Sequence, residues 1–253
     1  PFTIKGHVAV ITMSNAPANT WTHDSLDSLA DLILDFNQDK NIYSLVITGA
    51  GEKFFSAGAD LNLFADGDKQ TAVLMATAFG RAFEALSQFR GLSIAAINGY
   101  AMGGGLEVAL ACDLRIAESQ AQMALPEAAV GLLPCAGGTQ NLAWLVGEGW
   151  AKRMILCGER VSAQQALDIG LVEAVVESGQ ALEQALLWAQ KSEQQSPTSV
   201  AACKRLIQNA RSHPMIAGMA CERDEFVNLF NSNDQKEGVQ AFLEKRQPQW
   251  TNS

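Results

Sequence analysis

The chain has 253 residues, of which 48% are hydrophobic and 18% are charged. This composition excludes a disordered chain and provides enough apolar material for a sizeable core, in one large domain or in a domain with an appendage. The net charge of −9 argues against nucleic acid as a general partner, because an acidic chain gains little from a phosphate backbone. A locally basic pocket for one anionic ligand remains compatible with this charge.

Strand-like and helix-like segments alternate through the first half of the chain. The pattern at 22–38 is helical, because Leu26, Leu29, Ile33 and Phe36 recur at helical spacing. Alternation of this kind predicts an α/β layer structure with mainly parallel strand pairing. The predicted elements are a strand at 7–13, a helix at 22–38, a strand at 43–48, a helix at 73–89, a strand at 93–97, a helix at 105–112 and a strand at 114–117.

The second half of the chain is nearly all helical in pattern after Trp144. The composition changes at Ser196-Pro197, which predicts an α/β core domain over residues 1–195 and a helical C-terminal region over residues 196–253. The predicted helical segments are 161–169, 180–194 and 199–211.

Five scattered cysteines form no C-x-x-C pair, and an odd, scattered set predicts reduced thiols in a cytoplasmic setting. The first residues show no basic segment leading into an apolar run, so no signal peptide is expected in them. No apolar stretch reaches the length of a bilayer, so no transmembrane helix is expected. The cysteines are Cys112, Cys135, Cys157, Cys203 and Cys221.

Two glycine-rich turns are the first candidates for a functional site. One is Phe-Phe-Ser-Ala-Gly-Ala-Asp at 54–60, and the other is Asn-Gly-Tyr-Ala-Met-Gly-Gly-Gly-Leu-Glu at 98–107, which opens a predicted helix. Glycine lets a ligand approach the backbone, and the free N–H groups at a helix start favour negative charge. Neither turn matches the nucleotide motifs or a nucleophile elbow, and a single Gly-Gly-Gly turn more often serves strand-to-helix packing.

Two glutamates lie in apolar stretches beside glycine-rich turns. Glu107 is followed by Val108 to Ala111, and Glu127 follows Pro126 in a stretch that leads to Gly137-Gly138. A carboxyl buried in such surroundings has a raised pKa, which suits acid–base chemistry. A single glutamate of this kind is more often a helix-start or solvated residue, but two of them beside glycine turns favour a site.

Taken together, these motifs resemble the crotonase superfamily, also called the enoyl-CoA hydratase/isomerase superfamily. The resemblance covers nearly the whole chain, and it implies a ClpP/crotonase-like α/β fold, a spiral of ββα units with a helical C-terminal trimerisation region. It also implies a coenzyme A thioester as the substrate. The segments that carry the resemblance are 57–60, 98–107, 126–127, 137–140, 156–158, 163–171 and 242–246.

The resemblance implies an enoyl-CoA hydratase, a lyase of fatty-acid β-oxidation. Such an enzyme adds water across the C2–C3 double bond of a 2-enoyl-CoA to give a 3-hydroxyacyl-CoA. The backbone N–H groups of Ala59 and Gly104 match the oxyanion hole, which stabilises an enolate-like oxygen. Glu107 and Glu127 match the acid–base pair, with Glu127 expected nearest the C2 proton transfer and Glu107 expected to activate water. The pair is expected to titrate as a unit.

Further contacts to coenzyme A or to the substrate follow from the resemblance. Lys53 is expected near the nucleotide, and the carbonyl of Ala57 is expected to meet the adenine. Phe242 and Lys245 match a pair that reaches a neighbouring subunit's ligand, although an amphipathic terminal helix explains them equally well. Coenzyme A belongs to the substrate, and no separate cofactor is expected. The full set is Lys53, Ala57, Gly58, Asp60, Leu61, Gly103, Pro126, Gly131, Phe242 and Lys245.

Other residues are candidates for a lesser role. Trp21 is a candidate to narrow an acyl pocket, but core packing is the preferred interpretation. The same holds for Met75, Phe79 and Phe83, which share one helical face. The three histidines, His7, His23 and His213, have no ligand spacing, so no metal site is expected.

Several alternatives to the hydratase stay open. The nearest is a Δ3,Δ2-enoyl-CoA isomerase, in which one carboxylate shuttles a proton, and a decarboxylase or thioester hydrolase is a further option. A non-catalytic acyl-CoA-binding or RNA-binding relative, or a module of a multifunctional enzyme, is also considered. Retention of both Glu107 and Glu127 favours the hydratase, and the acidic balance argues against RNA. The expected partners are an acyl-CoA and further copies of the chain, as a homotrimer or a dimer of trimers, with no nucleic acid and no membrane.

Overall fold

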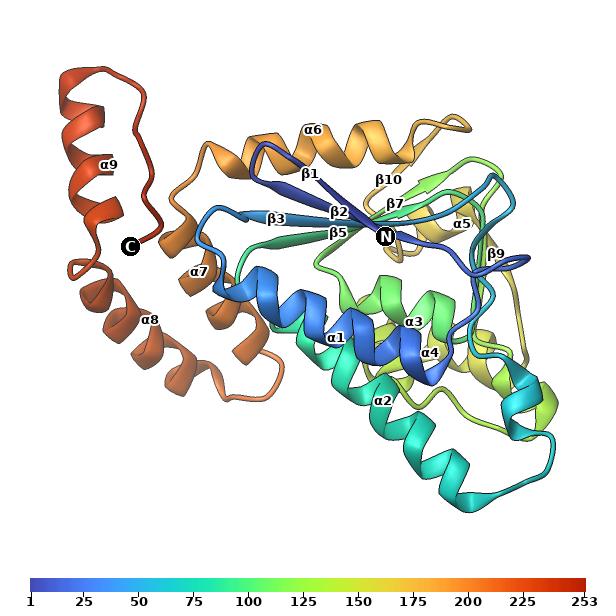
Figure 1. Cartoon of the computed structure of the whole chain (residues 1–253). Helices are drawn as coiled ribbons and strands as arrows, with labels where there is room; N and C mark the ends of the chain where they lie inside the picture. Colours follow the sequence, from blue (N-terminus) through green and yellow to red (C-terminus); the bar gives the residue numbers. More distant parts are fainter.

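The computed structural model describes residues 1–253 and contains two β-sheets surrounded by helices (Figure 1). The larger sheet has six strands in the order β1-β2-β3-β5-β7-β10, and the smaller has four in the order β4-β6-β8-β9. Only the β1–β2 and β8–β9 pairs are antiparallel. The strands are β1 Phe2–Lys5, β2 Val8–Met13, β3 Ser44–Gly49, β4 Phe54–Ser56, β5 Leu92–Ile97, β6 Tyr100–Met102, β7 Leu114–Glu118, β8 Gln122–Ala124, β9 Val161–Ser162 and β10 Ala174–Val176.

Helices cover both faces of the larger sheet. Helix α6 lies on one face, and α1 and α2 lie on the other (Figure 1). The helices are α1 His23–Gln38, α2 Lys69–Ser87, α3 Gly104–Ala111, α4 Gly138–Leu156, α5 Ala163–Asp168, α6 Ala181–Glu193, α7 Pro197–Asn209, α8 Met215–Leu229 and α9 Asn233–Glu244, with short 3-10 helices η1 at Leu61–Phe64 and η2 at Glu127–Val130.

The chain repeats one unit of two strands and a helix. Strand β3 in the large sheet leads to β4 in the small sheet and then to α2. The same order recurs as β5, β6 and α3, and again as β7, β8 and α4. This arrangement is the predicted spiral of ββα units, and the α/β fold class is confirmed. The small sheet places the ends of β4, β6 and β8 side by side, next to the start of α3.

The core has two parts, one on each face of the large sheet. Strand β3 is buried throughout, as expected for a parallel strand covered on both faces. On one face Ala181, Ala185 and Ala189 bring one side of α6 against the sheet. On the other face the main core includes Trp21, whose ring packs edge-on against Phe83 with centroids 5.7 Å apart.

Two predicted boundaries were wrong. Helix α2 begins at Lys69 rather than at residue 73, because the Asp68 carboxylate accepts hydrogen bonds from the N–H groups of the following turn and caps the helix. The predicted helix at 161–169 begins as a strand, because Val161 and Ser162 pair with β8. The Ser162 hydroxyl then caps α5.

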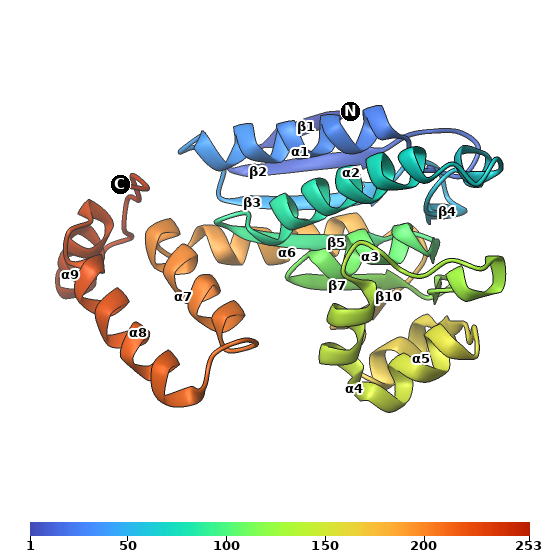
Figure 2. The same cartoon turned by 90° about the horizontal axis from the view of Figure 1, so that it is seen from below.

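The last three helices extend away from the sheets (Figures 1 and 2). Helix α8 has no buried residue. The buried Asp234 carboxylate accepts hydrogen bonds from the N–H groups of Thr251 and Asn252, which ties the end of the chain to α9. No helix is both long and apolar enough to cross a membrane. The exposed apolar side chains of α8, α9 and the turn between them are Met215, Ile216, Met219, Phe226, Val227, Phe230, Val239, Phe242 and Leu243.

The contact between α3 and β4 leads to a stability prediction. A Cβ atom at Gly105 would overlap the carbonyl oxygen of Ser56, so Gly105→Ala is expected to lower the free energy of unfolding by about 1–3 kcal/mol. Thermal or urea unfolding followed by circular dichroism measures the change. Gly149→Ala in α4 is the matched control, because no atom lies within 4 Å of its added Cβ. A Gly105→Ala protein as stable as the control would contradict the close contact.

Candidate active site

A mainly apolar cavity of about 780 Å³ lies between α2, the start of α3 and the chain around η2. Its walls come from three successive ββα units, because the small sheet brings their loops to one place. Nine of the residues predicted from the sequence line it: Ala57, Ala59, Leu61, Gly103, Gly104, Glu107, Pro126, Glu127 and Gly131.

Glu107 lies in the first turn of α3 and is only 2% exposed. Its Oε1 atom accepts hydrogen bonds from the N–H groups of Ala136 at 2.8 Å and Gly138 at 2.9 Å. Burial raises the pKa of Glu107, and the two hydrogen bonds oppose that rise. Because Gly138 begins α4, the helix dipole also favours the charged carboxylate. The Glu107 carboxyl is therefore held in place as a hydrogen-bond acceptor.

Glu127 has a different environment, although it faces the same cavity. Its Oε2 atom is buried and has no hydrogen-bond partner in the chain. Burial is the main cause that raises its pKa to about 7, and the negative charge of Glu107 raises it further. A Cβ atom on Gly103 would lie 3.0 Å from Oε1 of Glu127, so a larger residue at 103 would crowd the carboxyl. Glu127 is thus a carboxyl that can hold or release a proton near neutral pH.

Ala59 and Gly104, whose N–H groups were predicted to act as donors, both line the cavity. The N–H of Trp21 donates to the carbonyl of Gly58, and the N–H of Asp60 donates to the carbonyl of Trp21. The N–H of Ala59, between these two bonds, has no acceptor. The N–H of Gly104 begins α3 and precedes its hydrogen-bond ladder. A Cβ atom on Gly58, whose φ is +89°, would lie 2.7 Å from the carbonyl oxygen of Met102 and 3.0 Å from the nitrogen of Gly104. The two segments therefore touch through glycine.

Five of the predicted contacts lie outside the cavity walls. Gly58 supports the turn, the Asp60 carboxylate caps η1, and the Lys53 ammonium lies 5.3 Å from the ring centroid of Phe54. Phe242 lies in the last turn of α9 and is 83% exposed, and Lys245 directly follows this helix. Helix α9 lies far from α2 and α3 in space (Figure 1). One chain alone does not bring them to the cavity, so their role stays a prediction.

Sequence reasoning missed most of the apolar wall. Met75 and Phe79 were expected to be core residues; they are buried and also line the cavity, whereas Phe83 does not. Ala72 and Ala76 share a helical face with Phe79, and that spacing was the signal that could have found them. The wall residues that were not predicted are Thr20, Phe64, Ala72, Ala76, Ala129, Val130, Leu132, Leu133 and Cys135.

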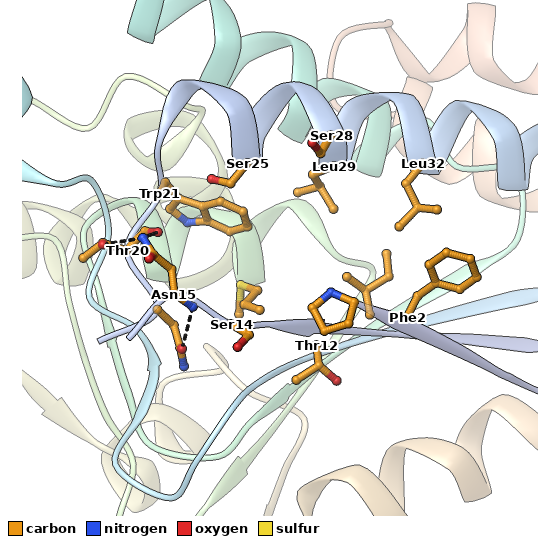
Figure 3. A pocket seen from close by; sticks show the side chains of 14 residues that line it. Phe2, Thr12, Ser14, Asn15, Thr20, Trp21, Ser25, Ser28, Leu29 and Leu32 are labelled. Carbon is orange, nitrogen blue, oxygen red and sulfur yellow. Dashed lines mark hydrogen bonds between the residues drawn. The ribbon is translucent and has the colours of Figure 1, made fainter. Parts of the chain in front are cut away.

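A separate groove of about 380 Å³ lies between β2 and α1 (Figure 3). Trp21, Ser25, Leu29 and Leu32 face it, while the indole N–H of Trp21 is buried without a partner. The Trp21 ring also approaches the other side, where its Cδ1 atom would be 3.6 Å from a Cβ on Gly104. Trp21 therefore separates this groove from the turn that carries the free N–H groups.

Two carboxyls and two glycine-rich turns thus line one apolar cavity, an arrangement that can support acid–base chemistry. The enoyl-CoA hydratase/isomerase family matches residues 3–253, and the chain belongs to this family. It is 37% identical to a short-chain-enoyl-CoA hydratase of Clostridium acetobutylicum, over 96% of this chain and 93% of the relative. The resemblance found in the sequence is therefore confirmed.

Two solved structures extend the comparison. Pseudomonas aeruginosa DspI superposes with a TM-score of 0.96 at 65% identity, covering 99% of this chain and 95% of DspI. An enoyl-CoA hydratase from Bacillus anthracis superposes with a TM-score of 0.95 at 36% identity, covering 100% of this chain and 99% of that one. The crotonase-like fold thus holds over the whole length of the chain.

The raised pKa of Glu127 predicts a dependence of stability on pH. The folded chain keeps a proton on Glu127 up to about pH 7, while the unfolded chain loses it near 4.5. Between these values the folded state binds more protons, so the contribution of this group to stability falls as pH rises and then stays constant. Glu127→Gln cannot lose a proton, so its stability relative to the original chain is expected to increase between roughly pH 5 and pH 7. Urea unfolding across this range measures the difference in stability between the two proteins. Parallel curves of stability against pH would contradict the raised pKa of Glu127.

Proposed function

We propose that the chain is an enoyl-CoA hydratase that adds water to a 2-enoyl-CoA. The observation that carries the proposal is the meeting of Glu107 and Glu127 with the N–H groups of Ala59 and Gly104 in one apolar cavity. Carboxyls supply the acid and the base that hydration needs, and the backbone donors suit the thioester oxygen. The apolar wall suits an acyl chain.

The proposed reaction begins with the thioester carbonyl oxygen between the N–H groups of Ala59 and Gly104. Glu107 takes a proton from water as the water oxygen bonds to C3. The C2–C3 π pair moves toward the carbonyl and forms an enolate, which the two donors stabilise. Glu127 then gives its proton to C2, and the product is a 3-hydroxyacyl-CoA. Each donor of such a hole is worth roughly 2.7–4 kcal/mol in the transition state.

The two environments support this division of roles. The hydrogen bonds from Ala136 and Gly138 favour the charged form of Glu107, which suits a base. The pKa of Glu127, raised to about 7, lets that carboxyl carry a proton at neutral pH, which suits an acid. Because the charge of Glu107 acts on Glu127, the pair titrates together.

An isomerase is the second candidate, because one carboxyl that shuttles a proton would use the same cavity. The hydratase is favoured because both carboxyls line the cavity and because two of the relatives named above, those of Clostridium acetobutylicum and Bacillus anthracis, are described as hydratases. An isomerase needs no second carboxyl to activate water.

The proposal includes a homotrimer or a dimer of trimers, since the exposed apolar side chains of α8 and α9 need a partner surface. In such an assembly Phe242 and Lys245 would contact a neighbouring subunit's nucleotide, as Lys53 and the Ala57 carbonyl would within the subunit. No cofactor beyond the coenzyme A of the substrate is proposed. The five free cysteines support a cytoplasmic location, and the reaction fits fatty-acid β-oxidation.

The first test is hydration of crotonyl-CoA, followed by the loss of its enoyl-thioester absorbance. Glu107→Gln and Glu127→Gln are each expected to lower kcat by about 10²-fold or more, because each removes one acid–base group. Glu183→Gln, an exposed glutamate on α6, is the matched control and should leave the rate unchanged. A wild-type chain that binds crotonyl-CoA without hydrating it, but isomerises a 3-enoyl-CoA, would sink the hydratase in favour of the isomerase.

The proposed acid role of Glu127 also sets a pH profile. Hydration needs the protonated form of Glu127, so kcat/KM for crotonyl-CoA is expected to fall above about pH 7, approaching tenfold per pH unit. The reverse dehydration should fall over the same range, because the reaction releases no net proton and its equilibrium constant fixes the ratio of the two kcat/KM values. Initial rates in both directions between roughly pH 5 and pH 9 measure the two profiles. A hydration rate that stays flat through pH 7 would assign the acid role elsewhere.

A further inference from the structure

Two further spaces adjoin the catalytic cavity. Cys135, in the loop before α4, lines the catalytic cavity and also two others, a groove of about 660 Å³ and a small cavity of about 110 Å³. Ala76 on α2 lines both the catalytic cavity and the groove. These shared wall residues place the three spaces next to one another along α2.

Small side chains of α2 line these spaces. Ala72, Ala76 and Gly80 follow one another at four-residue spacing on the face toward these spaces. Gly80 lines the groove and the small cavity, and a Cβ atom there would meet only Oε1 of Glu84, at 3.6 Å. Helix α2 runs from the edge of the molecule that carries β4 toward α7 (Figure 2). The groove and the small cavity therefore lie farther toward the α7 end of α2 than the catalytic cavity does.

The small cavity adjoins a further space near the C-terminal helices. It shares Ser87, Ala111 and Asn141 with a cleft of about 730 Å³ beneath α7. Its lining combines charged residues, among them Asp113, Lys204 and Arg211, with the apolar residues Leu92, Leu110, Leu114, Val200 and Ile207. An acyl chain that extends past Cys135 would thus reach further apolar side chains.

We propose that Cys135 and Gly80 form a rear opening of the acyl pocket, through which the tail of a long, unbranched acyl chain leaves the catalytic cavity. The two positions then determine which acyl chain lengths the enzyme accepts. This inference rests on the proposed function and names the substrate class of the same site.

The Cys135 thiol is neutral where the tail would pass, because partial burial, with a further contribution from Glu107, raises its pKa to about 11. The one guanidinium beside the groove, that of Arg81, is paired with Asp27 and Asp31. In the cleft beneath α7, Arg211 donates a hydrogen bond to the side-chain oxygen of Asn141.

The first experiment compares kcat/KM for crotonyl-, octenoyl- and dodecenoyl-CoA. The wild-type chain should keep its efficiency up to dodecenoyl-CoA. Gly80→Leu should leave crotonyl-CoA hydration unchanged and lower the value for dodecenoyl-CoA by about tenfold or more, because each methylene kept from its apolar site costs about fourfold. Val73→Leu is the matched control, since Val73 is exposed on the same helix and lines none of these cavities. Val73→Leu should leave kcat/KM unchanged for both crotonyl-CoA and dodecenoyl-CoA.

A second readout does not depend on turnover. Saturated lauroyl-CoA should protect Cys135 of the wild-type chain from alkylation at about pH 9, and butyryl-CoA should not. Mass spectrometry of the digested protein resolves each thiol, and the exposed Cys157 serves as an internal reference because it lines none of these spaces.

The outcomes separate the two proposals. A wild-type chain that hydrates no enoyl-CoA overturns the proposed function, even if lauroyl-CoA protects Cys135. A wild-type protein that hydrates crotonyl-CoA but discriminates against dodecenoyl-CoA overturns the proposal of a rear opening alone. Equal behaviour of Gly80→Leu and wild type toward dodecenoyl-CoA, or equal alkylation of Cys135 under both thioesters, also overturns it.

Discussion

The close approach of two backbone turns through glycine is the constraint on which the rest of the structure depends. Gly105 lies so near the Ser56 carbonyl that a Cβ atom has no space, and Gly58 meets the backbone of Met102 and Gly104 in the same way. This contact joins two successive ββα units at the edge of the small sheet. Because the units touch there, Ala59 and Gly104, from distant parts of the chain, line one cavity. Any wider spacing would separate the donors and displace α3, and with it Glu107.

The same turns set two unlike environments for two like side chains. Glu107 is held by N–H groups at the start of α4, whereas one oxygen of Glu127 is buried with no partner in the chain. Burial without a partner in the chain disfavours the charged form of Glu127 and raises its pKa to about 7. This suits a group that exchanges a proton, since a carboxyl bonded on both oxygens by N–H groups would hold its ionised form more firmly.

The cavity wall combines a rigid part and an open part. Met75 and Phe79 are buried in the core and fix one side, while the alanines and the glycine of α2 leave room on the next face of the helix. The C-terminal helices add no residue to this wall within one chain, and they carry exposed apolar side chains. Glu107 and Glu127 therefore belong to the α/β body, apart from α7 to α9.

The order and spacing of the motifs sufficed to predict the family, the two glutamates and the glycine turns, because each is a contiguous signal of turn, helix start or apolar run. The alternation of strands and helices likewise predicted the α/β class. The sequence could not predict that Glu107 meets Ala136 and Gly138, some thirty residues away, or that Cys135 joins several cavities. It also placed the start of α5 wrongly, because pairing with β8 outweighs the helical pattern at Val161. These features were decided only by tertiary structure, since they depend on which distant surfaces pack together, and local spacing carries no information on that.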